Sequence, residues 1–416
     1  MDLVFNKGGK TLDYIAAWFL LASNYIPKSH SKYAFVSTNS ICQGEQVYEL
    51  WKSILIENEI YFAHTSFKWE NNAKNKAGVS VVIVGIQSKN IGKKKLFTKN
   101  HMRLIENINP YLISGKTIFI ESRNHPLSKI AEMIGGNVAY DSGYLIFEEH
   151  EMLDFVKNNL GTEKFFRKII GGKELLNGTI RYCLWLKDYQ IEDLKNYEGI
   201  LTRVNKVKES RLAAKDEGTH KLAQRPHQFR DLNNPRNYIA LPKTSSERRT
   251  YIHLAYFDDT IIPIDSVRII PEAEPFLFVI ISSRMHMVWI KTVSGKLEDR
   301  YRYSKNISYN TFPFPLINEN TKEELESHAY KILTERENHS EKNLSQLYDP
   351  DKMPEGLREA HRLNDLAVER CYRSKPFESD EERLEYLFKL YEQMIEEEKS
   401  RGTLFGVENK PKRKKK

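Results

Sequence analysis

The sequence predicts an α/β half-sheet, followed by an α+β domain and an all-α C-terminal region. Helix-like and strand-like segments alternate over the first hundred residues, short strands and helices mix up to about residue 315, and helical periodicity prevails from about residue 320. A chain of 416 residues is long enough for two or three domains with their own cores. We therefore expect domains at 1–100, 101–318 and 319–402, followed by a disordered basic tail at 403–416.

The first region reads as part of an α/β sheet. "TLDYIAAWFLLASNYI" (11–26) and "GEQVYELWKSILIEN" (44–58) have apolar residues at helical spacing, whereas "YAFVSTNS" (33–40) and "IYFAH" (60–64) are typical of strands. The apolar run "VSVVIVGI" (79–86) predicts a strand buried on both faces. This order is typical of the back half of an α/β sheet whose first half is missing.

Later segments are shorter until the C-terminal helices begin. The Lys-rich stretch 88–100 is expected to be an exposed connector, and 194–215 a basic helix. Two further helices are predicted at 353–372 and 379–399. The strand candidates between about residues 101 and 315 are "KTIFIES", "GYLIF", "TIRYCLWL", "YIALP", "TYIHLAYF" and "FLFVIIS".

Charge and cysteine content restrict the function classes. The formal net charge is +8, but most of it lies in the terminal "KPKRKKK", so a basic binding face must come from local clustering. Cys42, Cys183 and Cys371 are far apart, which argues against a zinc site or disulfides and fits a reducing cytosol. The N-terminal "MDLVFNKGGK" has no signal-peptide shape, and the apolar stretch "YIAAWFLLASNYI" is too short to span a bilayer. We expect a cytoplasmic protein with no membrane segment and no metal site.

Familiar catalytic motifs do not occur. There is no G-x-G-x-x-G, P-loop, G-x-S-x-G or H-E-x-x-H. "EEK" (397–399) has the spacing of a nuclease carboxylate–lysine site, but a solvated helix face explains it better. His253 and His286 stand singly among apolar residues and are predicted to be core histidines.

Basic, hydroxyl and aromatic residues cluster in "SSERRTY" (245–251), "SSRMHMVW" (282–289) and "GKLEDRYRYSKNISYNTFPFP" (295–315). Arg can bond guanine edges or phosphate, and Ser and Tyr hydroxyls can bond phosphate oxygens. Glu298 and Arg300 are two apart, so an extended segment directs both to one side. Glu accepts from cytosine N4 and Arg donates to guanine, so the two together can read one base pair. The alternative is a solvated strand with a salt bridge.

Eight segments carry a family resemblance in their order along the chain. They are "LDYIAAWFLLASNYI", "YAFVSTNSICQGEQV", "FAHTSFKWENNAKNKAGVSVVIVGI", "RYCLWL", "SRLAAKDEGTHKLAQRPHQF", "LPKTSSERRTYI", "SSRMHMVWIKTVSGKLEDRYRYSKNISYNTFPFP" and "LYDPDKMPEGLREAHRLNDLAVERCY". From about residue 11 to about 375 the chain resembles the MmeI-type restriction–modification enzymes. That family fuses a nuclease, an adenine-N6 DNA methyltransferase and a target-recognition domain.

The resemblance has a gap at its catalytic end. The family's methyltransferase has a glycine-rich loop for S-adenosylmethionine and an Asn-Pro-Pro-aromatic tetrapeptide, and neither occurs here. The resemblance therefore implies a partial methyltransferase at 1–100, a target-recognition domain at 101–318 and a helical C-terminal domain at 319–402. It implies duplex DNA as the partner, no cofactor on this chain alone, and S-adenosylmethionine in the complete enzyme. Alternatives are a split methyltransferase that works with an N-terminal polypeptide, and an inactive remnant or protein-interaction module.

The resemblance also implies roles for individual residues. Glu298 and Arg300 match the pair that sets base identity at one position. Phe67, or else Trp69, matches an aromatic that stacks on the flipped adenine. Lys206, Lys208 and Arg211 of the basic helix are candidates for phosphate contacts, and His286 is a second-tier candidate. The expected backbone or groove contacts are Arg248, Arg249, Arg284, Arg302, Tyr303, Lys305, Tyr309 and Asn310.

Overall fold

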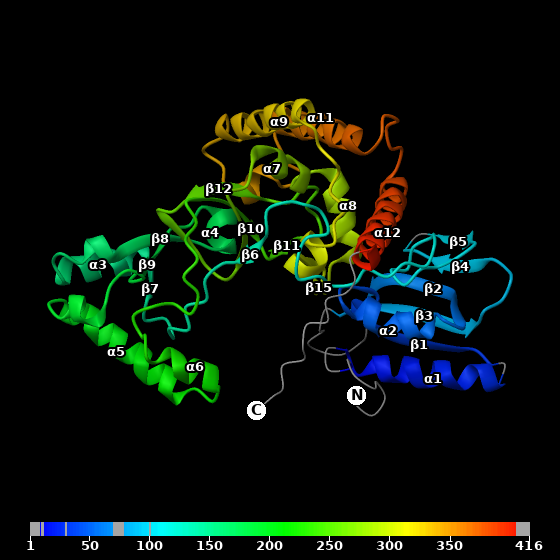
Figure 1. Ribbon diagram of the computed structural model, residues 1–416, viewed down its shortest axis with the longest axis horizontal. Helices are drawn as coiled ribbons and strands as arrows, with labels where there is room; N and C mark the ends of the chain where they lie inside the picture. Colours follow the sequence, from blue (N-terminus) through cyan, green and yellow to red (C-terminus); the bar gives the residue numbers. More distant parts are fainter. Residues whose placement is uncertain (1–8, 10–11, 30, 70–78, 100, 405–416) are drawn as a thin grey trace. The chain divides into compact units, whose positions relative to one another are not determined.

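A computed structural model describes residues 9, 12–29, 31–69, 79–99 and 101–404, so most of the predicted basic tail lies outside the described residues. The chain forms two compact units, and each is built from separate stretches (Figure 1). Unit 1 comprises Met1–Ile130, Val288–Leu316 and Arg373–Lys416. Unit 2 comprises Ala131–Met287 and Ile317–Tyr372. Each unit therefore combines segments that are far apart in the sequence.

A five-stranded sheet of order β1-β3-β2-β4-β5 is the centre of unit 1. β3 runs antiparallel to both β1 and β2, and β2 runs parallel to β4. The central position of β3 explains its apolar sequence, because both of its faces are covered. The strands are β1 (Tyr33–Thr38), β2 (Asn58–Lys68), β3 (Ser80–Ser88), β4 (Lys94–Phe97) and β5 (Met102–Ile105).

Helices α1 (Ile15–Ser29) and α2 (Gln46–Ile54) pack on this sheet, as Figure 1 shows in blue. α2 buries Val47, Leu50, Trp51 and Ile54 at helical spacing. The Trp51 indole donates a 2.7 Å hydrogen bond to the carbonyl of Ile41, which satisfies its buried N–H. The predicted helix–strand alternation of the first region is confirmed.

Unit 1 leaves apolar surface exposed beside β1. Tyr14, Trp18, Leu21 and Tyr25 recur at helical spacing in and just before α1, and each is between 50% and 72% exposed. Among the described residues, β1 pairs only with β3, so its other edge carries no strand. We call these four side chains and the outer edge of β1 the α1–β1 surface.

The Lys-rich stretch after β3 is not the simple connector that the sequence predicts. β4 and β5 form there and extend the sheet beyond β2. Lys94 is buried, where its ammonium contacts Glu59 and donates a 2.9 Å bond to the carbonyl of Asn90. In the sequence, a lysine that forms a buried ion pair within a sheet cannot be distinguished from a lysine in an exposed loop. The prediction of an exposed connector was wrong for this reason.

The segment "KTIFIES" was expected to be a strand but pairs with none. Ile118 and Ile120 are buried, and the backbone N–H of Ile120 donates to the Tyr111 hydroxyl at 3.2 Å. The N–H of Glu121 donates to the hydroxyl of Tyr391 in α12 (Asp380–Leu404), also at 3.2 Å. Tyrosine hydroxyls thus replace a neighbouring strand as partners for this extended backbone.

Unit 2 contains two four-stranded sheets, of order β12-β10-β14-β6 and β13-β8-β9-β7. Their apolar faces form two hydrophobic clusters, one centred on Phe147, Phe165 and Trp185 and the other on Tyr238 and Ile269. The strands are β6 (Ile134–Gly135), β7 (Ile146–Glu148), β8 (Phe166–Ile170), β9 (Arg181–Leu184), β10 (Asn237–Pro242), β12 (Ala255–Asp258), β13 (Ile261–Pro263) and β14 (Val267–Pro271), with β11 at Thr244–Ser245. The predicted α+β character is confirmed.

The candidate strand "FLFVIIS" is a helix, α7 (Pro275–Ile281). Pro275 occupies the first helical turn, where its missing N–H costs nothing. All residues from Leu277 to Ile281 are buried, so the run shows no amphipathic period that would distinguish helix from strand. "TYIHLAYF" contributes only its end, as β12, because the preceding residues form an irregular buried segment.

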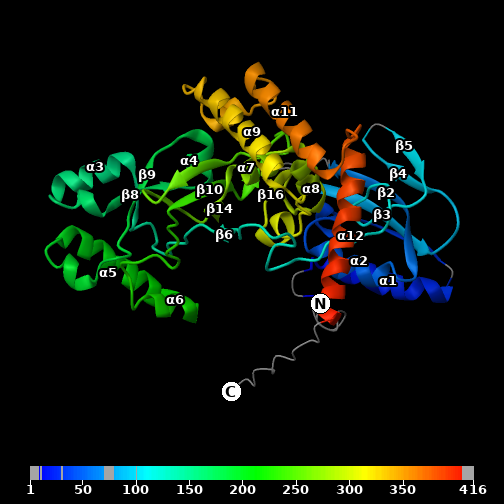
Figure 2. The same cartoon turned by 45° about the horizontal axis from the view of Figure 1, so that its top comes forward.

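Residues from 319 on are helical, as predicted. α9 (Glu319–Glu337) and α11 (Glu355–Tyr372) lie side by side over α7, which Figure 2 shows in yellow and orange. The other helices of unit 2 are α3 (Glu149–Asn158), α4 (Gly172–Asn177), α5 (Glu198–Ala213), α6 (Glu217–Leu222) and α10 (Leu344–Leu347), and α8 (Arg284–Val293) continues into unit 1. The predicted fold class is therefore confirmed.

A buried polar cluster links α11 to the rest of unit 2. One Asp365 carboxyl oxygen accepts from the Tyr251 hydroxyl at 2.7 Å, and the other accepts from the backbone N–H of Arg284 at 2.8 Å. Burial raises the pKa of Asp365 to about 7. The ring of His361 stacks on Tyr251 at 4.1 Å, and burial lowers the pKa of His361 well below its usual value.

Candidate nucleic-acid interface

A short hairpin presents the predicted base-reading pair in unit 1. β15 (Lys296–Leu297) and β16 (Arg300–Arg302) pair antiparallel around a two-residue turn made by Glu298 and Asp299. Glu298 has φ +58°, a left-handed conformation in which a side chain costs of order 1 kcal/mol relative to glycine.

The two side chains of the pair lie together and face solvent. Arg300 Nη2 donates to Glu298 Oε2 at 3.0 Å, and the side chains of Glu298 and Arg300 are 69% and 48% exposed. An exposed ion pair contributes roughly 0–1 kcal/mol, so a binding partner can replace it at little cost. Glu298 and Arg300 therefore lie together as predicted, although Glu298 belongs to the turn and not to an extended strand. Their contact with a base pair remains a prediction.

Aromatic and charged residues alternate in the segment 301–314 because the aromatic side chains face the core. Tyr301, Tyr303, Tyr309, Phe312 and Phe314 are all buried, whereas the intervening charged residues are exposed or half-buried. Their rings form a core of unit 1, in which Phe312 packs edge-on against Phe314 at 4.8 Å. The alternation therefore separates core from solvent, and the rings are not a stacking surface for bases.

Three of the predicted DNA contacts are corrected by this burial. Tyr303 and Tyr309 are at most 3% exposed, so their hydroxyls are not presented to a duplex. Asn310 is fully buried and donates through Nδ2 to the carbonyl of Arg123 at 2.8 Å. Its amide fixes the backbone of the extended segment beside it. The sequence could not distinguish an inward Asn or Tyr from an outward one.

Arg302 and Lys305 remain predicted contacts to the DNA backbone. Arg302 is exposed and Lys305 half-buried, and among the described residues neither side chain takes part in an ion pair. Lys305 begins a single π-helical turn, Lys305–Tyr309, directly after β16. The guanidinium and the ammonium are therefore available next to the Glu298–Arg300 pair in sequence, at the surface of the same unit.

Phe67 and Trp69 lie at the end of β2. Both are exposed, and the Phe67 ring lies 6.5 Å from the ring of His64. Phe67 pairs with Val81 across the sheet, so its backbone is fixed while its ring faces outward. Either aromatic is available for stacking, and Phe67 remains the preferred candidate for the flipped base.

The predicted contacts in unit 2 differ in availability. Arg284 is exposed at the start of α8, whereas His286 is fully buried and burial lowers its pKa to about 3. Arg248 is exposed and forms a surface ion pair with Asp351. Arg249 is half-buried and donates to the carbonyl and hydroxyl of Ser345 at 2.8 and 3.0 Å. Arg249 therefore has a structural role, and Arg248 and Arg284 are the better candidates.

Arg211 in the basic helix α5 is buried and stabilises the fold, so it is not available to bind phosphate. Arg211 is 1% exposed, and its guanidinium donates to five backbone carbonyls, all within 3.0 Å: those of Ala139, Tyr140, Leu222, Arg225 and Gln228. Burial, with the nearby charge of Arg225, lowers its pKa to about 10, so it stays charged near neutral pH. Lys206 and Lys208 remain as surface cations on this helix, with Lys208 exposed.

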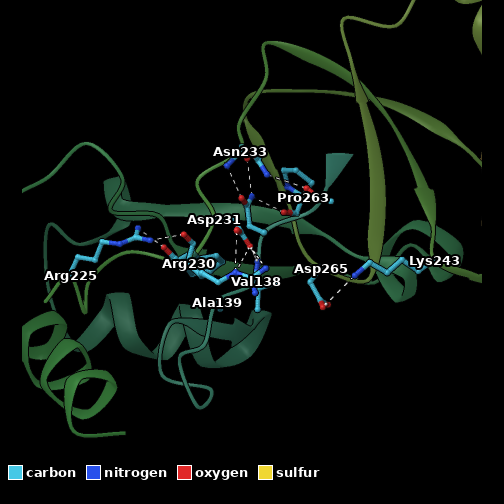
Figure 3. Close-up of polar contacts among 12 residues, drawn as sticks. Val138, Ala139, Arg225, Arg230, Asp231, Asn233, Lys243, Pro263 and Asp265 are labelled. Carbon is cyan, nitrogen blue, oxygen red and sulfur yellow. Dashed lines mark hydrogen bonds and ion pairs between the residues drawn. The ribbon is translucent and has the colours of Figure 1, made fainter. Parts of the chain in front are cut away.

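Other arginines of this region also stabilise the fold. Arg225 donates to the carbonyl of Arg230 at 2.6 Å, and Arg230 forms an ion pair with Asp231 at 2.8 Å (Figure 3). The Asp231 carboxylate accepts the N–H of Val138 at 3.1 Å, while the Asn233 backbone joins the same polar cluster. Several basic residues that are close in sequence therefore form hydrogen bonds and ion pairs within the fold. The number of basic residues in a stretch of sequence overestimates the number available to bind DNA.

No group of three or more His, Cys, Asp or Glu in the described part of the chain could hold a metal ion. Likewise, over those residues no single helix has the length and apolar composition to cross a membrane, although α7 and α8 pass that test as a bent pair. His253 is buried as predicted, and burial lowers its pKa to about 3.

Comparisons with known proteins agree with this organisation. Three family models match in order: the MmeI DNA-methyltransferase domain at residues 1–98, the MmeI target recognition domain at 114–316 and the MmeI C-terminal domain at 317–397. DNA methyltransferase A of Bacillus subtilis (strain 168) is 44% identical over 393 residues, which are 94% of this chain and 45% of that protein.

A solved structure of an MmeI enzyme is also similar to this chain. The type IIL restriction–modification enzyme MmeI, in complex with DNA, superposes with a TM-score of 0.91 at 37% identity, covering 95% of this chain and 54% of MmeI. The chain thus spans about half the length of the relatives that it matches. The chain belongs to the MmeI family of restriction–modification enzymes, whose methyltransferase, target-recognition and C-terminal domain models it matches in that order.

Proposed function

We propose that this chain recognises a specific duplex DNA sequence as part of an adenine-N6 restriction–modification methyltransferase. The observation that carries the proposal is the exposed Glu298–Arg300 pair on a hairpin tip, whose side chains lie 3.0 Å apart. A carboxylate that accepts from cytosine N4 and a guanidinium that donates to guanine together suit one G·C pair. The solved complex of MmeI with DNA supports duplex DNA as the partner. Arg302, Lys305, Arg248 and Arg284 are then phosphate or groove contacts, and Phe67 stacks on the flipped adenine.

Methyl transfer itself is assigned to a complete enzyme and not to this chain alone. Positioning S-adenosylmethionine and polarising the adenine amino group need groups that this sequence does not contain. We propose a methyltransferase part at 1–100, a target-recognition part at 101–318, a helical part at 319–402 and a basic tail at 403–416. Because its substrate is chromosomal or invading DNA, the proposal places the protein in the cytoplasm.

DNA binding is expected to depend on salt and on Lys305. Lys305→Ala should weaken binding to all duplexes similarly and lower the slope of log K against log salt by about one unit, because one phosphate contact is lost. Fluorescence anisotropy on a labelled random duplex at several salt concentrations measures both quantities. Lys157→Ala, an exposed lysine on α3, is the control. A complete lack of DNA affinity at low salt would refute the proposal and favour a protein-interaction module.

A second candidate function is favoured by the α1–β1 surface. The open edge of β1 and the exposed Tyr14, Trp18, Leu21 and Tyr25 are features of a sheet and helix layer that continue into another polypeptide segment. In this version the chain is one half of a split methyltransferase, and the other half supplies the cofactor site.

The split methyltransferase is tested by complementation. We expect no methyl transfer to DNA from the chain alone, and transfer from S-adenosylmethionine after mixing with the part of the Bacillus relative that this chain does not cover. Leu21→Glu should abolish the gain by placing a charge in the contact, whereas Leu153→Glu, at an exposed leucine of α3, should not. Adenine methylation by the chain alone would contradict the assignment, and no gain on mixing would rule out the split version.

A further inference from the structure

Asp299, the second residue of the hairpin turn, makes contacts that the base-reading pair does not. Its Oδ1 accepts a hydrogen bond from the Ser80 hydroxyl at 2.7 Å, and its Oδ2 lies 3.7 Å from the ammonium of Lys68. Ser80 lies 219 positions away in sequence and is buried. Glu298 and Arg300 face solvent, whereas Asp299 between them contacts the sheet of unit 1.

The partners of Asp299 belong to one point of that sheet. Lys68 is the last residue of β2 and Ser80 the first of β3, and the two are register partners. Phe67 precedes Lys68 directly and is the candidate for stacking on the flipped base. One carboxylate therefore connects the hairpin that would read a base pair to the strand end that would receive the target base.

A second anchor holds the base of the same hairpin. The backbone N–H of Gly44, just before α2, donates to the carbonyl of Val293 at 3.0 Å. Gly44 has φ +60°, and a Cβ there would lie 3.4 Å from Gly295, so glycine suits this close approach. The base of the hairpin is therefore held at Gly44, and the Asp299 contacts hold its tip.

The Ser80 bond is the stronger of the two tip contacts. A hydrogen bond to a charged group from a buried donor is stronger than a neutral one, and loss of the acceptor leaves the Ser80 hydroxyl buried without it. Lys68 is 74% exposed, so its attraction is weakened by solvent.

We propose that Asp299 is a positioning residue that fixes the recognition hairpin against the methyltransferase sheet, and so sets the distance between the base pair read and the base modified. This inference rests on the proposed DNA recognition. Directional base contacts require exact placement, and a displacement of about 1 Å reduces such contacts strongly. Loss of Asp299 should therefore lower discrimination between sites while leaving phosphate contacts intact.

The test compares affinities for the selected duplex, for the same duplex with its Glu298–Arg300 base pair replaced, and for a random duplex. Asp299→Ala and Ser80→Ala should each lower the ratio of the first two affinities by about tenfold and change random-duplex affinity by less than about twofold. Asp299→Asn keeps an acceptor for Ser80 and should retain most of the ratio. Asp13→Ala removes another aspartate bonded to a serine hydroxyl, that of Ser40, and is the control.

The outcomes separate the inference from the proposed function. If the unmodified chain has no site preference, DNA recognition fails before Asp299 is tested. If it has a preference and both Asp299→Ala and Ser80→Ala keep it with unchanged thermal stability, the positioning role is wrong. Loss of the ratio in Asp299→Ala with recovery in Asp299→Asn, at equal stability, is the result expected for a positioning residue.

Discussion

Exchanging Glu298 and Arg300 as a pair is expected to reverse the orientation of the base pair preferred at one position of the site. In the unmodified chain Glu298 accepts from cytosine N4 and Arg300 donates to guanine, so interchanging the two exchanges the strands on which these bases are read. Each well-made contact of this kind discriminates by about 1–3 kcal/mol, or roughly 5- to 150-fold in affinity. Selection from a randomised duplex library, followed by sequencing, measures the change.

A glycine variant separates recognition from folding in this experiment. Glycine adopts the φ of +58° at position 298 without strain, so Glu298→Gly should fold at least as stably as the unmodified chain. It should nevertheless lose preference at the one position, because no carboxylate remains to accept from cytosine. If the paired exchange left the selected sequence unchanged, Glu298 and Arg300 would not read a base pair.

Acid is expected to destabilise unit 2, because three of its histidines are buried in the neutral form. Burial lowers the pKa of His253 and His286 to about 3 and that of His361 well below its usual value. These rings stay neutral in the folded chain but gain a proton in the unfolded chain near pH 6.5. Their contribution to stability is therefore complete above pH 6.5 and is lost as the pH falls toward 3.

Asp365 changes the stability of unit 2 with pH in the opposite direction, and its contribution is smaller than that of the histidines. Because its folded pKa is raised to about 7, the folded chain holds a proton that the unfolded chain releases, so acid favours folding between pH 7 and 4. From pH 8 to 4.5, His253 and His286 together cost about 5 kcal/mol and Asp365 offsets about 3 kcal/mol. The lowered pKa of His361 adds to the loss, so the histidines dominate.

Urea unfolding at several pH values measures this balance. His253→Phe removes one protonation site at similar volume and should reduce the acid loss by about a third of the histidine share, whereas the same exchange at His150, exposed on α3, should not. Asp365→Asn should make the loss steeper. A free energy of unfolding that is constant from pH 8 to 4.5 would contradict the assignment of these buried groups.

The arrangement of strands and helices was largely predictable where the pattern was periodic. α1, α2, β1, β2 and β3 follow from apolar spacing, because each has one or two defined faces. α7 was misread because a fully buried segment loses the amphipathic period that distinguishes helix from strand. "KTIFIES" has strand composition, but tyrosine hydroxyls satisfy its backbone instead of a neighbouring strand.

The candidate site was predictable only where neighbours in sequence determine it. The Glu298–Arg300 pair depends on a spacing of two residues, which sequence shows directly. The directions of Tyr303, Tyr309 and Asn310 depend on which side of the segment meets the core, and that depends on packing against distant elements. Asp299 gives no signal of its own, because its partners Lys68 and Ser80 come from strands more than 200 residues earlier.

The most direct test is an experimental structure of this chain bound to its selected duplex. We expect the 295–302 hairpin to enter the major groove, with the Glu298 carboxylate near a cytosine N4 and the Arg300 guanidinium near the guanine of the same base pair. We also expect Asp299 to keep its hydrogen bond with Ser80. A complex in which this hairpin lies away from the double helix would show that Glu298 and Arg300 do not read a base pair.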